Sequence, residues 1–221
     1  MTKTDPGQTD GPEEEPQRYS MTSTESGTAP LGAGRRCPWA EHAGPAELAY
    51  HDLEWGVPHH GDRALFELLS LEGAQAGLSW SIVLGRREGY RRAFAGFDPD
   101  LLATWTDEQI DGLLRDAAII RHRGKIASVV SNARALCDLR QEGRDFDGYV
   151  WSFTEGVALQ PRHASPSDVP TTTDVAAALG RDLKRRGFRF VGPTIAYAFM
   201  QAVGMTNDHL TSCFRWAELA G

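Results

Sequence analysis

Residues 184–204 read KRRGFRFVGPTIAYAFMQAVG, and this stretch predicts two helices joined by a tight turn. A basic helix end meets Gly187, and a second glycine, Gly192, precedes Pro193, a residue favoured in the first turn of a helix. The free backbone N–H groups of the second helix would then point at the turn, where they can bind a phosphate. The same pattern also fits an ordinary glycine cap between two core helices, so both interpretations stay open on these residues alone.

A second helical hairpin is predicted between residues 114 and 126. Basic side chains gather in both hairpins, at Arg121, Lys125, Lys184 and Arg186. Such clusters can contact a phosphate backbone, and these four residues are therefore candidates for DNA binding together with the turn glycines. Runs of charge are also typical of helix ends that face water, which is the simpler interpretation of the charge pattern by itself.

The overall charge of the chain seems unsuited to DNA, because the formal net charge is −7. However, residues 1–34 contain six acidic and only two basic residues, so the excess is concentrated there. This segment is rich in Gly, Pro, Ser, Thr and Glu and poor in large apolar side chains, which predicts a disordered acidic tail. Local charge, rather than the total, decides whether a surface can contact phosphate.

Helical periodicity characterises the rest of the chain. Apolar residues recur at helical spacing in residues 126–136, and Asp62 and Thr173 are suited to helix caps. No strand alternation is evident, so we expect one all-α domain over residues 35–216 and a short C-terminal tail at 217–221. No apolar run approaches the roughly 20 residues that cross a bilayer, and no signal pattern is present, so a cytoplasmic location is expected.

Two pairs of possible metal ligands lie at opposite ends of the predicted domain. His209 and Cys213 are four residues apart and would share one face of a helix, while Cys37 and His51 lie near the start. Two thiols and two imidazoles form a closed tetrahedral set suited to one structural zinc ion (Zn2+), which would clip the two ends of the domain together. On spacing alone, ordinary packing of these side chains is the simpler interpretation.

Four longer motifs carry a resemblance to a known family. They read YHDLEWGVP at 50–58, LEGAQAGLSW at 71–80, IIRHRGKI at 119–126 and RGFRFVG at 186–192. In this order they closely resemble the DNA-3-methyladenine glycosylase I family, a branch of the helix-hairpin-helix glycosylases. The resemblance extends from Arg36 to Arg215 and implies a helix-hairpin-helix glycosylase-like helical domain with a structural zinc clip.

The resemblance also implies roles for individual residues. Glu72 matches the carboxylate that recognises the base, Leu78 falls on the loop that approaches the gap left by a flipped nucleotide, and Gln75 is expected near the pocket. The residues that match zinc ligands are Cys37, His51, His209 and Cys213. The aromatic residues expected in the pocket are Tyr50, Trp55 and Trp80, with Trp39 as a further candidate.

The chain departs from the family pattern at two places. Family members often carry an aromatic residue three positions before the Tyr-His pair, whereas this chain has Glu47, so one wall of the pocket is open to question. Many related glycosylases use an aspartate after the hairpin helix, and Asp208 lies in that region. Because the family resembled here does not depend on that aspartate, Asp208 is expected to support or cap its neighbour His209 instead.

A reaction follows from the resemblance. The protein is expected to flip 3-methyladenine out of double-stranded alkylated DNA, hydrolyse its N-glycosidic bond and release free 3-methyladenine, which starts base excision repair. Trp55 and Trp80 would stack on the cationic base, and Glu72 would accept hydrogen bonds from it. No lysine-type nucleophile is evident, so the enzyme is expected to be monofunctional, without a lyase step, and to act as a monomer.

Three other functions are compatible with these residues. A zinc-stabilised binder of damaged DNA would share the hairpins and the metal clip without releasing a base. A glycosylase with shifted base specificity is suggested by Glu47. A helical protein-interaction module is a weaker alternative, because two basic hairpins and a glutamate among tryptophans are unusual in such a module.

Overall fold

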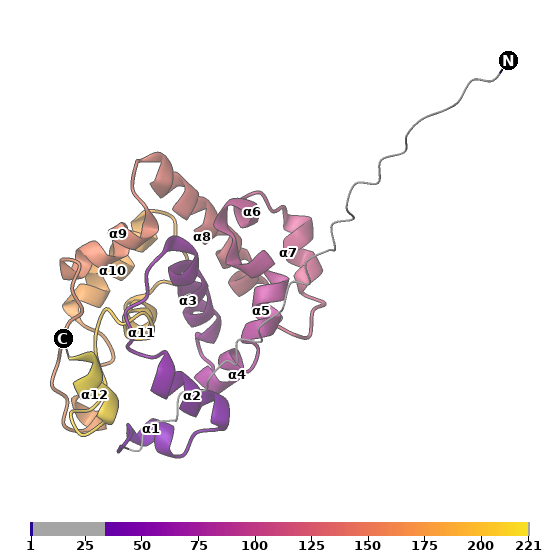
Figure 1. Cartoon of the computed structure of the whole chain (residues 1–221). Helices are drawn as coiled ribbons and strands as arrows, with labels where there is room; N and C mark the ends of the chain where they lie inside the picture. The colour runs from indigo at the N-terminus through magenta and orange to yellow at the C-terminus, as the bar shows by residue number, and fades with distance from the viewer. Residues whose placement is uncertain (2–33, 221) are drawn as a thin grey trace. The chain divides into compact units, whose positions relative to one another are not determined.

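The computed structural model describes Met1 and residues 34–220, and every named element within them is a helix (Figure 1). The extended pairing in this part of the chain is a single bridge between Leu159 and Thr206. The prediction of an all-α fold is therefore confirmed. The predicted acidic tail lies almost wholly outside the described residues, and the predicted boundary at residue 216 falls inside the last helix, so the domain limits stay predictions.

The described helices follow one another with short connections. The α-helices are α1 (Pro38–Glu41), α2 (Pro45–Leu53), α3 (Asp62–Gln75), α4 (Trp80–Leu84), α5 (Arg87–Ala93), α6 (Pro99–Ala103), α7 (Asp107–Leu113), α8 (Arg123–Gln141), α9 (Phe146–Trp151), α10 (Asp174–Arg185), α11 (Pro193–Ala202) and α12 (Phe214–Leu219). The short 3-10 helices are η1 (Ala95–Phe97), η2 (Ser152–Thr154) and η3 (Pro166–Asp168).

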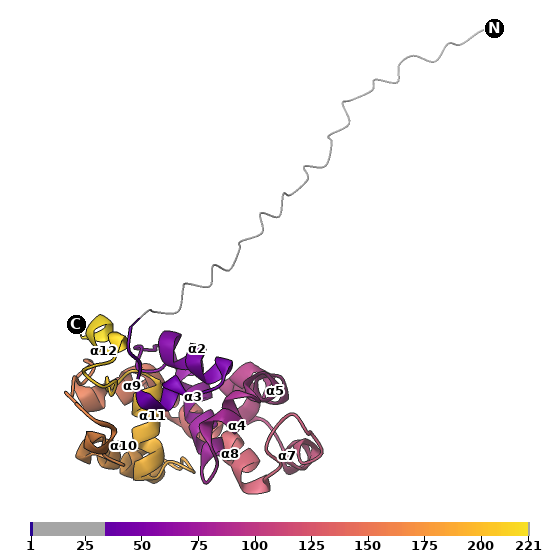
Figure 2. The ribbon, with the colours of Figure 1, turned by 90° about the horizontal axis from the view of Figure 1, so that it is seen from below.

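The core of the fold surrounds α3. This helix contacts α4, α8, α9 and α11, and Figures 1 and 2 show α3 and α11 in the middle of the bundle. Leu65, Phe66, Leu69 and Leu71 of α3 are almost fully buried, as the helical period of the sequence requires. Since α3 is held on several sides, a side chain near its C-terminal end can be positioned rigidly.

The first hairpin, residues 184–204, joins α10 to α11 as the sequence predicts. Gly187 has φ 93°, a left-handed conformation that ends α10 and that other residues rarely adopt. Gly192 is the N-cap of α11, and Pro193 occupies its first turn. The two helices cross closely because Gly180 of α10 faces the Val191 carbonyl, which would lie only 2.6 Å from any added Cβ atom.

The second hairpin, residues 114–126, connects α7 to α8, and these helices contact each other. His122 caps α8 by accepting a hydrogen bond from the Lys125 backbone N–H. Ile119 is buried and anchors the connection in the core. No helix among the described residues has the length and apolar character required to cross a membrane.

Candidate active site and metal centre

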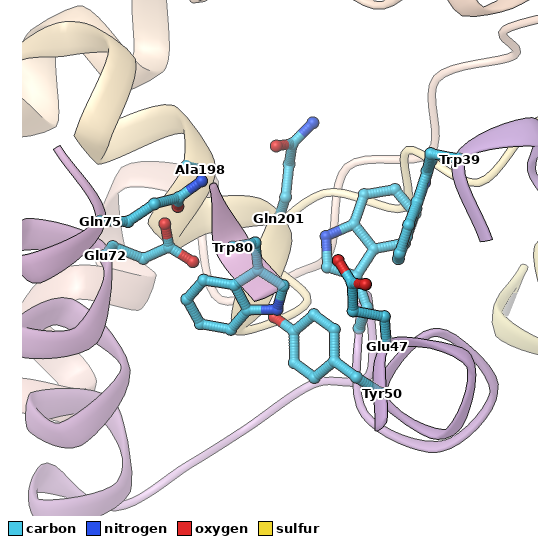
Figure 3. Close-up of a pocket in the computed structure, with 9 residues that line it drawn as sticks. Trp39, Glu47, Tyr50, Glu72, Gln75, Trp80, Ala198 and Gln201 are labelled. Atoms are coloured by element: carbon cyan, nitrogen blue, oxygen red, sulfur yellow. The ribbon is translucent and has the colours of Figure 1, made fainter. Parts of the chain in front are cut away.

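A cavity of about 190 Å³ opens between the N-terminal helices and α11 (Figure 3). This is smaller than the roughly 300–1,000 Å³ typical of drug-sized ligands, so it suits a single heterocycle. The residues that line it come from α1, α2, α3, α4 and α11 and the turn after α2. They are Trp39, Glu47, Tyr50, Trp55, Glu72, Gln75, Trp80, Ala198 and Gln201.

Glu72 is the buried charge-bearing group of this cavity. It lies near the C-terminal end of α3, its residue is only 4% exposed, and its Oε2 atom has no hydrogen-bond partner. Burial raises the pKa of Glu72 to about 8, because a carboxylate without water or a counter-charge is unfavourable. A buried acceptor without a partner is rare in folded proteins, and at the wall of a cavity it indicates a missing ligand.

Aromatic rings form much of the remaining wall. The Tyr50 and Trp80 rings lie 5.1 Å apart and are tilted by 45°. Trp39 and Trp55 meet edge to face, with 5.2 Å between their centroids. The Trp80 Nε1 atom is also buried without a partner. The cavity thus presents apolar ring faces together with two unpaired polar atoms, which suits a flat, polar-edged ligand.

Four buried side chains form a second cluster next to the cavity. The ligand atoms of Cys37, His51, His209 and Cys213 all lie within 4.8 Å of one another. Two thiols and two imidazoles at this spacing can hold a metal ion. A hydrogen bond from Cys37 lowers the pKa of the Cys213 thiol, which makes a thiolate available as a ligand.

Hydrogen bonds to surrounding residues orient both imidazoles of this cluster. His51 Nδ1 lies 2.8 Å from the Asp52 carboxylate, which is itself paired with Arg36. His209 Nε2 lies 3.0 Å from the Trp55 carbonyl. Each ring therefore directs its other nitrogen toward the two thiols, which is the arrangement found around bound metals.

The cluster also supports the aromatic wall. The Trp55 ring packs against His209 at 4.6 Å, and the Trp39 ring packs against His51 at 5.2 Å. Because Cys37 and His51 come from the start of the described chain and His209 from its end, the cluster joins two distant segments beside the cavity. A metal bound here would stabilise the position of both tryptophans.

The basic residues expected to contact DNA have different environments. Lys184 is exposed and, with Gly192, lines a surface hollow on the first hairpin. Gly187 and Arg121 are also exposed. Arg186, in contrast, forms ion pairs with Asp182 and Glu142 and lies over the Tyr149 ring, so its guanidinium is largely occupied within the protein.

Lys125 is also engaged within the protein. Its ammonium group donates hydrogen bonds to the carbonyls of Ala74 and Ala76, at 2.8 and 2.6 Å. These carbonyls end α3 and begin the turn that carries Leu78, a large apolar side chain that is 39% exposed. An exposed leucine at the tip of a turn beside the cavity is suited to insertion between bases.

Ala198 and Gln201 line the cavity, although the motifs did not indicate them. They are three residues apart on α11 and so share a face, a signal that helical spacing alone could have supplied. Gln201 is held by the Asp208 carboxylate, which also accepts a hydrogen bond from Thr206. Asp208 itself is buried and does not line this cavity.

The chain matches proteins of known activity along most of its length. A model of the methyladenine glycosylase family matches residues 39–216. DNA-3-methyladenine glycosylase 1 of Escherichia coli (strain K12) is 48% identical over 178 residues, which cover 80% of this chain and 95% of that protein. DNA-3-methyladenine glycosylase of Haemophilus influenzae is 43% identical, covering 80% of this chain and 96% of the relative.

Solved structures give the same result. A crystal structure of 3-methyladenine DNA glycosylase I is 50% identical, with a TM-score of 0.79, and covers 81% of this chain and 98% of its own. A variant of 3-methyladenine DNA glycosylase I in complex with 3-methyladenine is 35% identical, with a TM-score of 0.78, and covers 81% of this chain and 96% of its own. The helical fold and the arrangement of its elements are therefore shared.

Proposed function

The chain belongs to the methyladenine glycosylase family, and from this premise we propose that it excises 3-methyladenine from alkylated double-stranded DNA. The observation that carries the proposal is Glu72, a buried carboxyl group without a partner, in an aromatic-walled cavity of the size of one base. Free 3-methyladenine would be the product, and the reaction would start base excision repair. We further propose that the protein acts as a monomer in the cytoplasm.

Recognition would depend on the charge of the damaged base. Alkylation at N3 makes adenine cationic while it is attached to the sugar. Burial raises the pKa of Glu72 to about 8, so the empty cavity at neutral pH holds it mostly protonated. A cationic base would favour the ionised form, which then accepts a hydrogen bond from the exocyclic amino group. Binding of the correct base and ionisation of Glu72 would therefore support each other.

The aromatic wall would hold the flipped base. Tyr50, Trp55 and Trp80 present ring faces, and each face attracts a nearby cation by about 0.5–2 kcal/mol, depending on desolvation. Leu78 would fill the space that the base leaves in the duplex, which lowers the cost of flipping. Gln75, beside Glu72, would contact the polar edge of the base.

Cleavage then requires little further activation. The bond between the sugar C1′ and N9 breaks, its electron pair goes to the base, and the base leaves neutral. Water adds to C1′ and loses a proton, and an ionised Glu72 would stabilise the positive charge that develops on the sugar. No lysine lines the cavity, so no Schiff base with the sugar is expected and the enzyme would be monofunctional.

The metal centre has a structural role in this proposal. Cys37, His51, His209 and Cys213 would hold a zinc ion, since two thiols and two imidazoles are the usual structural zinc set. Bound zinc would join the two ends of the chain and stabilise them. It would keep Trp39 and Trp55 in the wall of the cavity.

Release of free base from methylated duplex DNA tests the proposed function. The wild-type protein should release 3-methyladenine, detected by chromatography and mass spectrometry. Glu72→Gln should lower the rate by about 10- to 100-fold, because a charge-assisted hydrogen bond in a dry site is lost. Glu108→Gln, an exposed change on α7, should leave it unaltered. Binding of the DNA without base release would instead identify a non-catalytic binder.

A further inference from the structure

The cavity contains a second carboxylate that the mechanism above does not use. Glu47 lies in the first turn of α2, is half-buried and lines the same cavity as Glu72. Figure 3 shows it beside Trp39 and Tyr50, on the side away from Glu72. Within the described part of the chain, no hydrogen bond or ion pair involves its carboxylate. It is therefore available to a ligand.

The two carboxyl groups of the cavity differ in their contact with water. Glu72 is buried, and its raised pKa of about 8 keeps it mostly neutral while the cavity is empty. Glu47 is only half-buried, and contact with water stabilises the charged form of a carboxylate. The lining includes no lysine or arginine that would neutralise Glu47. The negative charge of the empty cavity therefore resides mainly on Glu47.

The charge of a purine changes during the reaction. An N3-alkylated adenine is cationic while it is bonded to the sugar. When the bond breaks, the electron pair stays on the base and the released base is neutral. A fixed negative charge in the cavity therefore attracts the substrate base but gains nothing from the product.

Building on the proposed function, we infer that Glu47 is a specificity-determining residue, which selects cationic, sugar-linked purines over neutral bases, including the released product. Its expected effect is about tenfold in affinity, as for unit charges roughly 6 Å apart at an effective dielectric constant between those of a protein surface and of water. The same preference would reject undamaged adenine and ease the release of 3-methyladenine.

Two small probes separate charge from shape. Neutral 3-methyladenine represents the product, and 3,9-dimethyladeninium carries a permanent positive charge, with a methyl group in place of the sugar. Each is titrated into the full chain, and binding is followed by the fluorescence of the cavity tryptophans and by calorimetry. The variants are Glu47→Gln, which removes the charge at nearly constant size, Glu47→Asp, which keeps it, and the control Glu108→Gln.

Glu47→Gln should weaken binding of the cation by about tenfold and alter binding of 3-methyladenine by less than twofold. Glu47→Asp should retain most of the preference, and Glu108→Gln all of it. Equal weakening of both probes by Glu47→Gln would show a structural role and overturn the inference, as would no change in either. Base release by the wild-type protein is measured separately, so failure of the proposed function is distinguishable from failure of this inference.

Discussion

The Lys125 ammonium nitrogen lies 2.6 Å from the carbonyl oxygen of Ala76, and this hydrogen bond ties the second hairpin to the end of α3. A second bond, to the Ala74 carbonyl, holds the same segment. Carbonyls at a helix end lack partners within the helix, so a buried lysine stabilises them strongly. The turn that carries Leu78 therefore depends on a residue 47 or more positions away in the sequence.

Replacement of Lys125 should affect duplex DNA more than the free base. Lys125→Met removes both hydrogen bonds, so the Leu78 turn loosens and base flipping becomes less favourable. We expect excision from duplex DNA to fall by about tenfold or more, since each such bond contributes about 1.5–3 kcal/mol. Affinity for free 3-methyladenine should change much less. Lys125→Arg is the matched variant that keeps the charge, and an equal loss in both measurements for Lys125→Met would contradict this role.

The raised pKa of Glu72 predicts a pH-dependent cost in stability. The folded protein holds this proton up to about pH 8, whereas the unfolded chain releases it near the model value of 4.5. The folded state therefore binds more protons between these values, so Glu72 makes stability fall as the pH rises from about 4.5 to about 8. Above that range the cost is constant, at about 5 kcal/mol at most.

Glu72→Gln should remove this dependence. Its melting temperature should exceed that of the wild-type protein near pH 8 and approach it near pH 5, in the absence of base. Thermal unfolding at several pH values measures the difference between the two proteins, so contributions from other groups cancel. A gap that does not widen with pH would show that Glu72 is ionised throughout.

Zinc should co-purify at about one ion per chain. Cys213→Ser removes a thiolate from the Cys37, His51, His209 and Cys213 cluster, so metal content should fall and the melting temperature should drop by many degrees. Elemental analysis and calorimetry measure these effects. Cys137→Ser, at a partly exposed cysteine outside the cluster, is the control and should retain the metal. A fully folded wild-type protein without metal would refute the structural role.

Lys184 should contribute to DNA affinity through phosphate contact. Lys184→Ala should weaken binding of DNA of any sequence and reduce the slope of log K against log salt by about 0.9 for one phosphate contact. Titrations at several salt concentrations measure the slope. Arg92→Ala, an exposed change on α5 outside both hairpins, is the control. Arg186 is unsuitable for this test, since its ion pairs with Asp182 and Glu142 also support the fold. An unaltered slope would place the DNA surface elsewhere.

Local patterns in the sequence predicted much of the fold. The all-α class and the first hairpin, with its glycines at 187 and 192, are confirmed, because helical period and turn chemistry act over a few residues. The four Cys and His residues were recognisable as a set, and they lie together in the structure. Their pairing across the chain relied on a resemblance, since spacing alone cannot bring residue 37 to residue 213.

Other features depended on the tertiary structure. The sequence presents Lys125 and Arg186 as members of basic clusters, whereas packing directs the first to backbone carbonyls and the second to two acidic residues. The contribution of Gln201 to the cavity likewise required α11 to pack against α3.

The sequence by itself determined which chemical groups this protein has: helices, two basic hairpins, a set of metal ligands and a glutamate among tryptophans. Only the tertiary structure decided which of these groups are exposed, paired or isolated. Burial without a partner gives Glu72 its raised pKa, and partial exposure leaves Glu47 available in the same cavity. Desolvation and pairing depend on distances between segments far apart in the chain, and local residue order does not encode those distances directly.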